Sequence, residues 1–392
     1  MVFIGGLLAI LATAALSEQP APTEELRFQG RPVSEWRERM KGLDPSGPQA
    51  AENVPPLIEL IQSESIPEFT RRQAAITLGR IGKPAADAVP VLRQLLAETD
   101  SDSTRLWILK AFTLFGGTAG AASSEVAQFV RDADQTHLIR VAAIEALCRM
   151  GPQHPQVMQT LLDGVRGNLD TRNAVSRREL QMAAAEVLGL LGADAAPALP
   201  DLIRAAESDW DLLRLSAVTT LGHIGPQSEI AIPALADVIL FDDAPEVRDA
   251  AAVSLGAIGT AAVPTLTQLA SVRDPEVRER ALIGAIAIGP VGVPVLKFLL
   301  DDADLELRIR AADQLISRDE TSRRAATVLL LGMTVAPPRQ QRTAYMALRQ
   351  HPSAWSPADA EFQQLLHHTD PRLRQLAERL QRERPASSIP GE

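Results

Sequence analysis

Apolar residues recur along this chain with the 3.6-residue period of an amphipathic helix. Val247, Ala251, Leu255 and Ile258 fall on one face of such a helix. The same spacing returns 30 residues further along the chain, at Val277, Ala281, Ala285 and Ile288. The pattern predicts an all-α protein built from repeated helices.

The helices end and restart at a recurring motif. A helix closes with Leu-Gly-x-Ile-Gly, and after a short turn Val/Ile-Pro-x-Leu opens the next helix. The terminal glycine can adopt the left-handed conformation that ends a helix, and proline in a first turn lacks an N–H that would have no partner there. Closing motifs begin at Leu78, Leu188, Leu221 and Leu255, with degenerate copies at 114–117, 147–151 and 285–289, and second helices open at Val89, Leu199, Ile232, Val263 and Val293.

These copies recur with a period of 30 to 36 residues, which indicates stacked supersecondary units. We expect a right-handed α-solenoid of about nine to ten antiparallel helix pairs over residues 48–384, most regular over 181–315. Residues 30–47 are predicted to form an N-terminal capping helix. Residues 17–29 and 385–392 are predicted to be a flexible linker and a flexible tail.

The N-terminus begins with an uncharged apolar run that ends near residue 16. As a helix it would be roughly 22 Å long, short against a hydrocarbon core of about 30 Å. Residues 1–16 are therefore interpreted as a secretory signal peptide, although no Lys or Arg precedes the run; an uncleaved N-terminal anchor is the alternative. We expect an exported protein of the periplasm or cell envelope.

Charge and cysteine content narrow the possible functions. The formal net charge of −10 and pI near 5.3 argue against nucleic acid as a partner, and they leave the N-terminal segment as the only expected membrane contact. Cys148 is the single cysteine, so neither an intrachain disulfide nor a thiolate zinc site can form. We interpret Cys148 as a small buried residue.

Catalytic and metal motifs are absent from the sequence. It contains no GxSxG, GxxxxGK[ST] or HExxH pattern. His351, His367 and His368 with Glu361 could be considered as a metal cluster, but adjacent helical residues point about 100° apart. We therefore expect no catalytic residues, no metal and no cofactor.

The repeat unit that runs from Asp274-Pro275-Glu276-Val277-Arg278 to Gly289 resembles HEAT repeats, particularly the short type related to phycobilisome-lyase repeats. The resemblance covers about residues 48–384. The lead-in at 30–36 also looks like that of exported bacterial HEAT-repeat proteins. The iron-binding hydroxylases of this fold use His-Glu pairs, and no histidine here precedes a glutamate.

The resemblance also implies a ladder in which an arginine of each repeat meets acidic side chains of neighbouring repeats. Trp107 and Gln181 take the equivalent place in two units and would interrupt this ladder. In most repeats an arginine stands seven residues before the Leu or Ala at the first position of the closing motif. These predicted ladder arginines are Arg71, Arg140, Arg214, Arg248, Arg278 and Arg308.

The family contains scaffolds, adaptors, chromophore lyases and a few enzymes. The missing catalytic motifs favour a non-catalytic scaffold that binds a protein or peptide; the alternative is an accessory, lyase-like subunit of an enzyme. Breaks in the repeat, the polar insertion at 163–179 and aligned exposed positions suggest where a partner binds. The candidate residues are Trp107, Gln181, Arg166, Arg172, Asp249 and Glu279.

Overall fold

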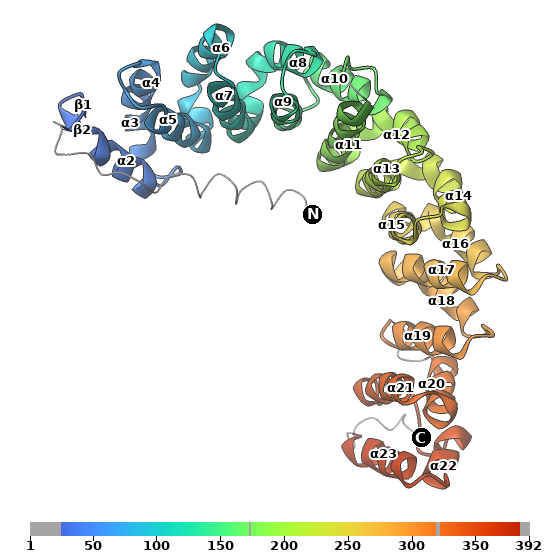
Figure 1. Ribbon diagram of the computed structural model, residues 1–392. Coiled ribbons are helices and arrows are strands. Elements are labelled where there is room, and N and C mark those ends of the chain that lie inside the picture. The colour runs from blue at the N-terminus through green and yellow to red at the C-terminus, as the bar shows by residue number, and fades with distance from the viewer. Residues whose placement is uncertain (1–24, 172–173, 319–321, 385–392) are drawn as a thin grey trace. The chain divides into compact units, whose positions relative to one another are not determined.

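The computed structural model describes residues 25–171, 174–318 and 322–384 (Figure 1). The predicted signal or anchor at 1–16, the tail at 385–392 and the candidate Arg172 lie outside these residues. The chain divides into two compact units at the boundary between Ala122 and Ser123. This boundary follows the degenerate copy of the closing motif at 114–117.

A short β-hairpin precedes the first described helix, where the sequence predicted a flexible linker. Strand β1 (Arg27–Phe28) pairs antiparallel with β2 (Arg31–Pro32). Gln29 and Gly30 form the turn with φ of 49° and 77°, the pair of positive angles that a tight two-residue hairpin uses. The Trp36 indole donates a hydrogen bond to the Phe28 carbonyl at 3.0 Å. This bond fastens the hairpin to the next helix, so the prediction of a linker through residue 29 was wrong at its end.

In the first unit, α5 packs against α2, α4 and α7, while α6 packs against α4 and α7. The elements are α2 (Val33–Gly42), α3 (Gln49–Glu52), α4 (Val54–Gln62), α5 (Glu68–Ile81), η1 (Lys83–Ala85), α6 (Ala88–Glu98), α7 (Asp102–Phe115) and η2 (Gly116–Ala122).

The second unit continues with helices of the same kind. They are α8 (Ser123–Arg131), α9 (His137–Met150), α10 (Pro155–Arg166), α11 (Ala174–Leu191), η3 (Gly192–Ala198), α12 (Leu199–Ala205), α13 (Asp211–Ile224), η4 (Gly225–Ala231), α14 (Ile232–Phe241), α15 (Pro245–Ile258), η5 (Thr260–Ala262), α16 (Val263–Ala270), α17 (Pro275–Ala287), η6 (Gly289–Gly292), α18 (Val293–Leu299), α19 (Leu305–Ile316), α20 (Arg323–Val335), α21 (Pro338–Gln350), α22 (Ala360–Leu366) and α23 (Pro371–Glu383).

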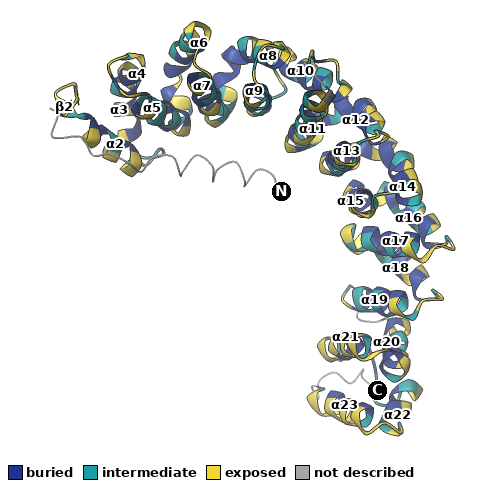
Figure 2. Cartoon of the chain, in the orientation of Figure 1, coloured by how far each residue is buried: buried dark blue, intermediate teal, exposed yellow. Residues whose placement is uncertain are grey.

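These helices stack in two layers within the second unit (Figure 1). One layer runs through α9, α11, α13, α15, α17, α19, α21 and α23, each packed on the next. The other layer contains the even-numbered helices from α8 to α22. Buried positions lie where the helices face one another, and exposed positions gather on the loops and outer surfaces (Figure 2). The core is therefore continuous along the stack and consists mainly of Ala, Leu, Ile and Val.

Two glycines show why the closing motif is needed. Gly225 ends α13 with φ of 72°, a conformation that L side chains rarely adopt. Gly256, inside α15, allows the next helix to approach: a Cβ there would lie 2.4 Å from the Ala287 Cβ. The first glycine of Leu-Gly-x-Ile-Gly thus sets the spacing between helices, and the second ends the helix.

Two stretches, Val175–Ala205 and Asp211–Phe241, are long and apolar enough to cross a membrane by length and composition. Each is interrupted by a glycine with positive φ, Gly192 or Gly225, and its apolar residues pack on neighbouring repeats. Both stretches are accounted for as helix pairs of the repeat core.

Candidate functional site

Two ladder arginines each hold a carboxylate between repeats. Arg214 donates from Nε and Nη2 to the two oxygens of Asp242 at 2.7 and 2.9 Å, and from Nη1 to the Ser208 carbonyl. Arg278 holds Asp302 in the same way, at 2.7 and 3.2 Å, and donates to the Val272 carbonyl. Each arginine therefore ties the loop before its own helix to the loop that leads into the next repeat.

The electrostatics of the Arg214 pair favour its charged form. Burial raises the pKa of Asp242, but hydrogen bonds from the Arg214 guanidinium and the Ala244 N–H lower this pKa more, so it lies below its ordinary value. The same hydrogen bond raises the pKa of Arg214. A bidentate bond of this kind constrains how neighbouring repeats stack.

The predicted ladder arginines Arg248, Arg308 and Arg71 are bound differently. Arg248 reaches Glu276 of the next repeat at 3.1 Å. Arg308 donates to the carbonyls of Asp302 and Ala303, with no carboxylate among its described contacts. Arg71 is half-buried and its Nε has no hydrogen-bond partner in the described structure. Carboxylates of neighbouring repeats thus complete the ladder at some positions and not at others.

The break predicted at Trp107 is a register error. Arg105 stands eleven residues before the helix-ending Gly116, as Arg214 stands eleven residues before Gly225. Like Arg214, Arg105 donates to the carbonyl six residues earlier, that of Thr99, at 2.9 Å. Counting back from Leu114 shifted the frame because Phe112, not Leu114, occupies the position of the motif's leucine in this repeat.

Trp107 itself does not fit a partner-binding surface. Its side chain is 3% exposed and packs inside the first unit. An indole buried to this degree is unavailable to a partner unless the repeat opens, so the prediction that Trp107 binds a partner was wrong. Arg105, which the sequence count missed, is the ladder residue of α7. Arg374 of α23 likewise donates to the carbonyl six residues earlier, that of His368, at 2.6 Å.

Gln181 keeps the ladder position of α11, eleven residues before Gly192. Its Nε2 donates to the Val165 carbonyl at 3.0 Å. The amide ties α11 to the last turn of α10, but it has no charge with which to hold a carboxylate.

Arg140 is the ladder arginine of α9, and its guanidinium is incompletely bound. Nε donates to the Val130 carbonyl at 2.8 Å and Nη1 to the Asp170 carbonyl at 2.7 Å. Nη2 is buried and has no hydrogen-bond partner. The residue is 3% exposed, and burial lowers its pKa, although the charges of Asp132 and Asp170 act in the opposite direction.

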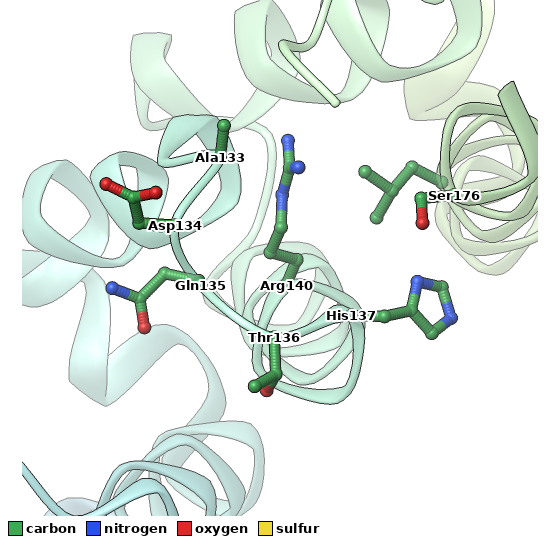
Figure 3. A pocket seen from close by; sticks show the side chains of 8 residues that line it. Ala133, Asp134, Gln135, Thr136, His137, Arg140 and Ser176 are labelled. Carbon is green, nitrogen blue, oxygen red and sulfur yellow. The ribbon is translucent and has the colours of Figure 1, made fainter. Parts of the chain in front are cut away.

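A cavity of about 200 Å³ opens beside Arg140. It is lined by the 133–137 loop that leads into α9, by Arg140, and by Ser176 and Leu180 of α11. In Figure 3 the Arg140 side chain rises from α9 and places its guanidinium between the loop at Ala133 and Ser176. His137 lies at the same mouth, with Nδ1 3.5 Å from the carboxylate of Glu179.

Asp249 and Glu279, predicted to be exposed binding positions, form a second row of contacts between repeats. Asp249 lies 3.1 Å from Nε of Arg280, and Glu279 lies 2.5 Å from Nη1 of Arg310. Both carboxylates are more than 40% exposed, so a partner can still reach them while they face the next repeat's arginine.

Arg166 also pairs within the stack. Its guanidinium contacts Asp201 of α12 at 2.9 Å and 3.0 Å, and Asp201 is largely buried. The hydrogen bond to Asp201 raises the pKa of Arg166. A partner at this position would meet an arginine whose fork is already occupied.

A larger open groove of about 420 Å³ lies between α14 and the segment 206–208 that follows α12. Phe241, the last residue of α14, lines it and is 78% exposed. Four carboxylates, those of Glu207, Asp237, Asp242 and Asp243, share the groove with a single guanidinium, that of Arg214. Arg214 binds Asp242 and Asp243, so Glu207 and Asp237 are left with no ion-pair partner among the described residues.

Across the described residues, no group of three His, Cys, Asp or Glu side chains is placed to hold a metal ion. The considered set of His351, His367, His368 and Glu361 is therefore not assembled as a metal site. Cys148 is buried, donates to the Val187 carbonyl at 3.3 Å, and burial raises the pKa of its thiol to about 11. These features indicate a packing role for Cys148.

Several solved structures have a similar fold. Importin beta aligns at a TM-score of 0.53 with 14% identity, covering 89% of this chain and 56% of importin beta. Kap121p bound to Pho4p aligns at 0.51 with 13% identity over 88% of this chain and 43% of Kap121p, and Kap121p bound to Nup53p aligns at 0.50. At such identities the likeness shows the fold alone, and this chain spans about half of the length of these proteins.

No curated protein matches the sequence. The family model described as HEAT repeats matches residues 42–113, 174–256, 211–287 and 232–316. The matched residues make up more than half of the 392-residue chain. The chain belongs to the HEAT-repeat family.

Proposed function

We propose that this protein is a non-catalytic scaffold of the cell envelope that binds a protein partner through the groove between α14 and the segment 206–208. The observation that carries the proposal is Phe241, a large aromatic side chain that is 78% exposed at the edge of an acidic groove. Exposed aromatic residues beside a concavity are typical anchors of protein interfaces.

The charges of the groove indicate what it binds. Glu207 and Asp237 are exposed and have no ion-pair partner among the described residues, so the groove carries a surplus of negative charge. A partner segment with Arg or Lys would neutralise this surplus, and the stem of that side chain would pack on the Phe241 ring. The groove therefore fits an extended basic segment of another protein.

The similar solved structures support a protein partner in general terms. Two of them contain Kap121p with a second protein bound, Pho4p or Nup53p. The envelope location rests on the uncharged run at 1–16 and on the lead-in at 30–36.

The test is site-specific photo-crosslinking in the source cells. Phe241 is replaced by a photoreactive phenylalanine, and the matched control carries the same replacement at Val335, which is 69% exposed and outside the groove. We expect a discrete crosslinked partner from position 241 and none from position 335. Phe241→Ala should weaken binding of that partner about tenfold, or about 1.4 kcal/mol. Equal adducts at both positions, or none, would refute the groove as the binding surface.

The location is tested separately by N-terminal sequencing of the mature protein from fractionated cells. Recovery in the envelope fraction, cleaved near residue 16 or retaining that segment as an anchor, supports export. Recovery of the full-length chain in the cytoplasmic fraction overturns it.

A further inference from the structure

The ladder position of α9 differs from the same position in α13 and α17. At Arg214 and Arg278, Nε and Nη2 together hold the two oxygens of one aspartate from the following loop. At Arg140, the following loop presents only the backbone carbonyl of Asp170, and Nη2 is left without an acceptor. The position therefore has an arginine suited to a carboxylate but no carboxylate bound to it.

An unfilled donor at this place is energetically significant. Arg140 is 3% exposed, and a buried polar group without a hydrogen-bond partner destabilises the fold. An acceptor brought from outside the chain would remove this destabilisation without displacing a bond that Arg140 already makes.

The cavity beside Arg140 provides the room and further donors. It has a volume of about 200 Å³ and is lined by the hydroxyl-bearing Thr136 and Ser176. Thr136 is the N-cap of α9, and its side chain makes no capping hydrogen bond. The positive end of this 14-residue helix therefore faces the same space as the free Nη2, and both favour a negatively charged group.

We propose that this cavity binds a carboxylate side chain, Asp or Glu, of a protein partner, which takes the place that Asp242 takes at Arg214. The proposal rests on the scaffold function above and assigns a second contact for a bound protein.

Size and charge explain why the carboxylate belongs to a protein. Small-molecule sites usually measure about 300–1,000 Å³, and this cavity is smaller, so it fits one anchoring side chain. Asp134 lines the cavity, and the charges of Asp132 and Asp170 also act on Arg140. These carboxylates weaken the attraction for a free anion, whereas an acidic residue within a polypeptide gains additional contacts from its neighbours.

Ligand-observed saturation-transfer NMR with the full chain tests the proposal. The probe is the pentapeptide acetyl-Gly-Ser-Glu-Ser-Gly-amide at millimolar concentration, and its matched control has Gln in place of Glu. We expect saturation of the Glu peptide at least fivefold above that of the Gln peptide, and equal signals would overturn the proposal. Inorganic phosphate is titrated in a separate experiment, and the line width of its phosphorus NMR signal is measured. If this line broadens in a way that depends on Arg140 while the Glu peptide does not bind, the cavity is a site for free anions and the proposal is overturned.

Variants separate the site from the fold. Arg140→Lys removes the fork and should abolish the Glu-peptide signal, whereas Arg278→Lys makes the same change at a filled position and should leave it unchanged. Ser176→Asp places a carboxylate in the cavity from within the chain and should abolish the signal while the circular dichroism melt is kept. Because Ser176→Asp tests the cavity even if Arg140→Lys fails to fold, a signal that persists in Ser176→Asp would overturn the proposal.

The outcome is distinguishable from a failure of the scaffold function. If Phe241 crosslinks a partner but the Glu peptide binds no better than the Gln peptide, only the carboxylate site is wrong. If the Glu peptide binds through Arg140 but no partner is crosslinked at Phe241, the groove is wrong and the carboxylate site stands.

Discussion

The repeats over α13–α17 and the repeat formed by α9–α11 are packed alike but are connected differently by polar contacts. In both regions the leucine that stands four residues before the helix-ending glycine, Leu255 in α15 and Leu147 in α9, is fully buried. In the first region the ladder arginines Arg214 and Arg278 hold carboxylates, while in the second the fork of Arg140 is partly empty. The packing of the apolar core is therefore the same in the two regions, whereas the pairing of the ladder arginines with carboxylates differs.

The difference shows how a repeat protein acquires a binding position without losing its fold. Because each repeat contacts only its neighbours, one polar contact can be left open at the cost of that contact alone. The open contact then becomes available to another molecule.

Leu255→Ala and Leu147→Ala should produce the largest losses. Both side chains have 0% exposure, and each truncation leaves a cavity that costs about 2–5 kcal/mol of unfolding free energy. Urea denaturation followed by circular dichroism measures both. A loss below about 1 kcal/mol for Leu147→Ala alone would show that the α9 region is loosely packed, and the comparison would have to be redrawn.

Asp242→Ala and Asp170→Ala should differ because they meet their arginines in different ways. Asp242→Ala removes both acceptors of a charged fork and should cost about 1.5–3 kcal/mol. Asp170 binds Arg140 through its backbone carbonyl, which alanine retains, so Asp170→Ala should stay within about 0.5 kcal/mol. The same denaturation experiment compares them, and equal losses would mean that the Asp170 carboxylate also supports Arg140.

Acid should remove the contribution of Asp242. Its pKa is lowered in the folded state below the ordinary 3.8, so its stabilisation is fully present at neutral pH and is lost as the pH falls through the lowered value. The stability difference between the natural protein and Asp242→Asn should therefore be largest near pH 7 and shrink below pH 3.8. A difference that is independent of pH would contradict a charged pair at this position.

The smallest effect concerns local opening, reported by thiol labelling. Burial raises the pKa of Cys148 to about 11, so at pH 7.5 a maleimide should react with it only when the α9 region opens. Ser254→Cys in a Cys148→Ser background places the matched thiol in α15, where residue 254 is 3% exposed. We expect Cys148 to react up to about tenfold faster, which corresponds to about 1.4 kcal/mol. Slower labelling of Cys148 would reverse the comparison.

Most of the helical architecture was predictable because its causes are local. The helical period, the closing glycines and the opening prolines lie within a few residues of the features they produce, and the all-α solenoid is confirmed. The hairpin at 27–32 was missed because four strand residues carry no periodic signal, and its turn depends on a positive φ at Gln29. The handedness and the number of helix pairs stay predictions.

The ladder was predictable only in part. Counting from the aligned Leu or Ala placed Arg214 and Arg278 correctly in register but chose Trp107 instead of Arg105 in α7. Counting eleven residues back from the glycine that ends each helix finds Arg105, because the helix end and not the leucine sets the frame. The sequence therefore held the signal, in the position of Gly116.

The sequence by itself determined that helices of this length pair and repeat, since glycine, proline and apolar spacing act through the local backbone and through contacts with adjacent units. Only the tertiary structure decided which arginines are satisfied. The acceptor for Arg214 lies 28 residues away and that for Arg140 lies 30 residues away, and one is a carboxylate and the other a carbonyl. At such a separation along the chain, either a side-chain carboxylate or a backbone carbonyl can accept a hydrogen bond from the guanidinium. Which of the two does so depends on how the two loops come together in space.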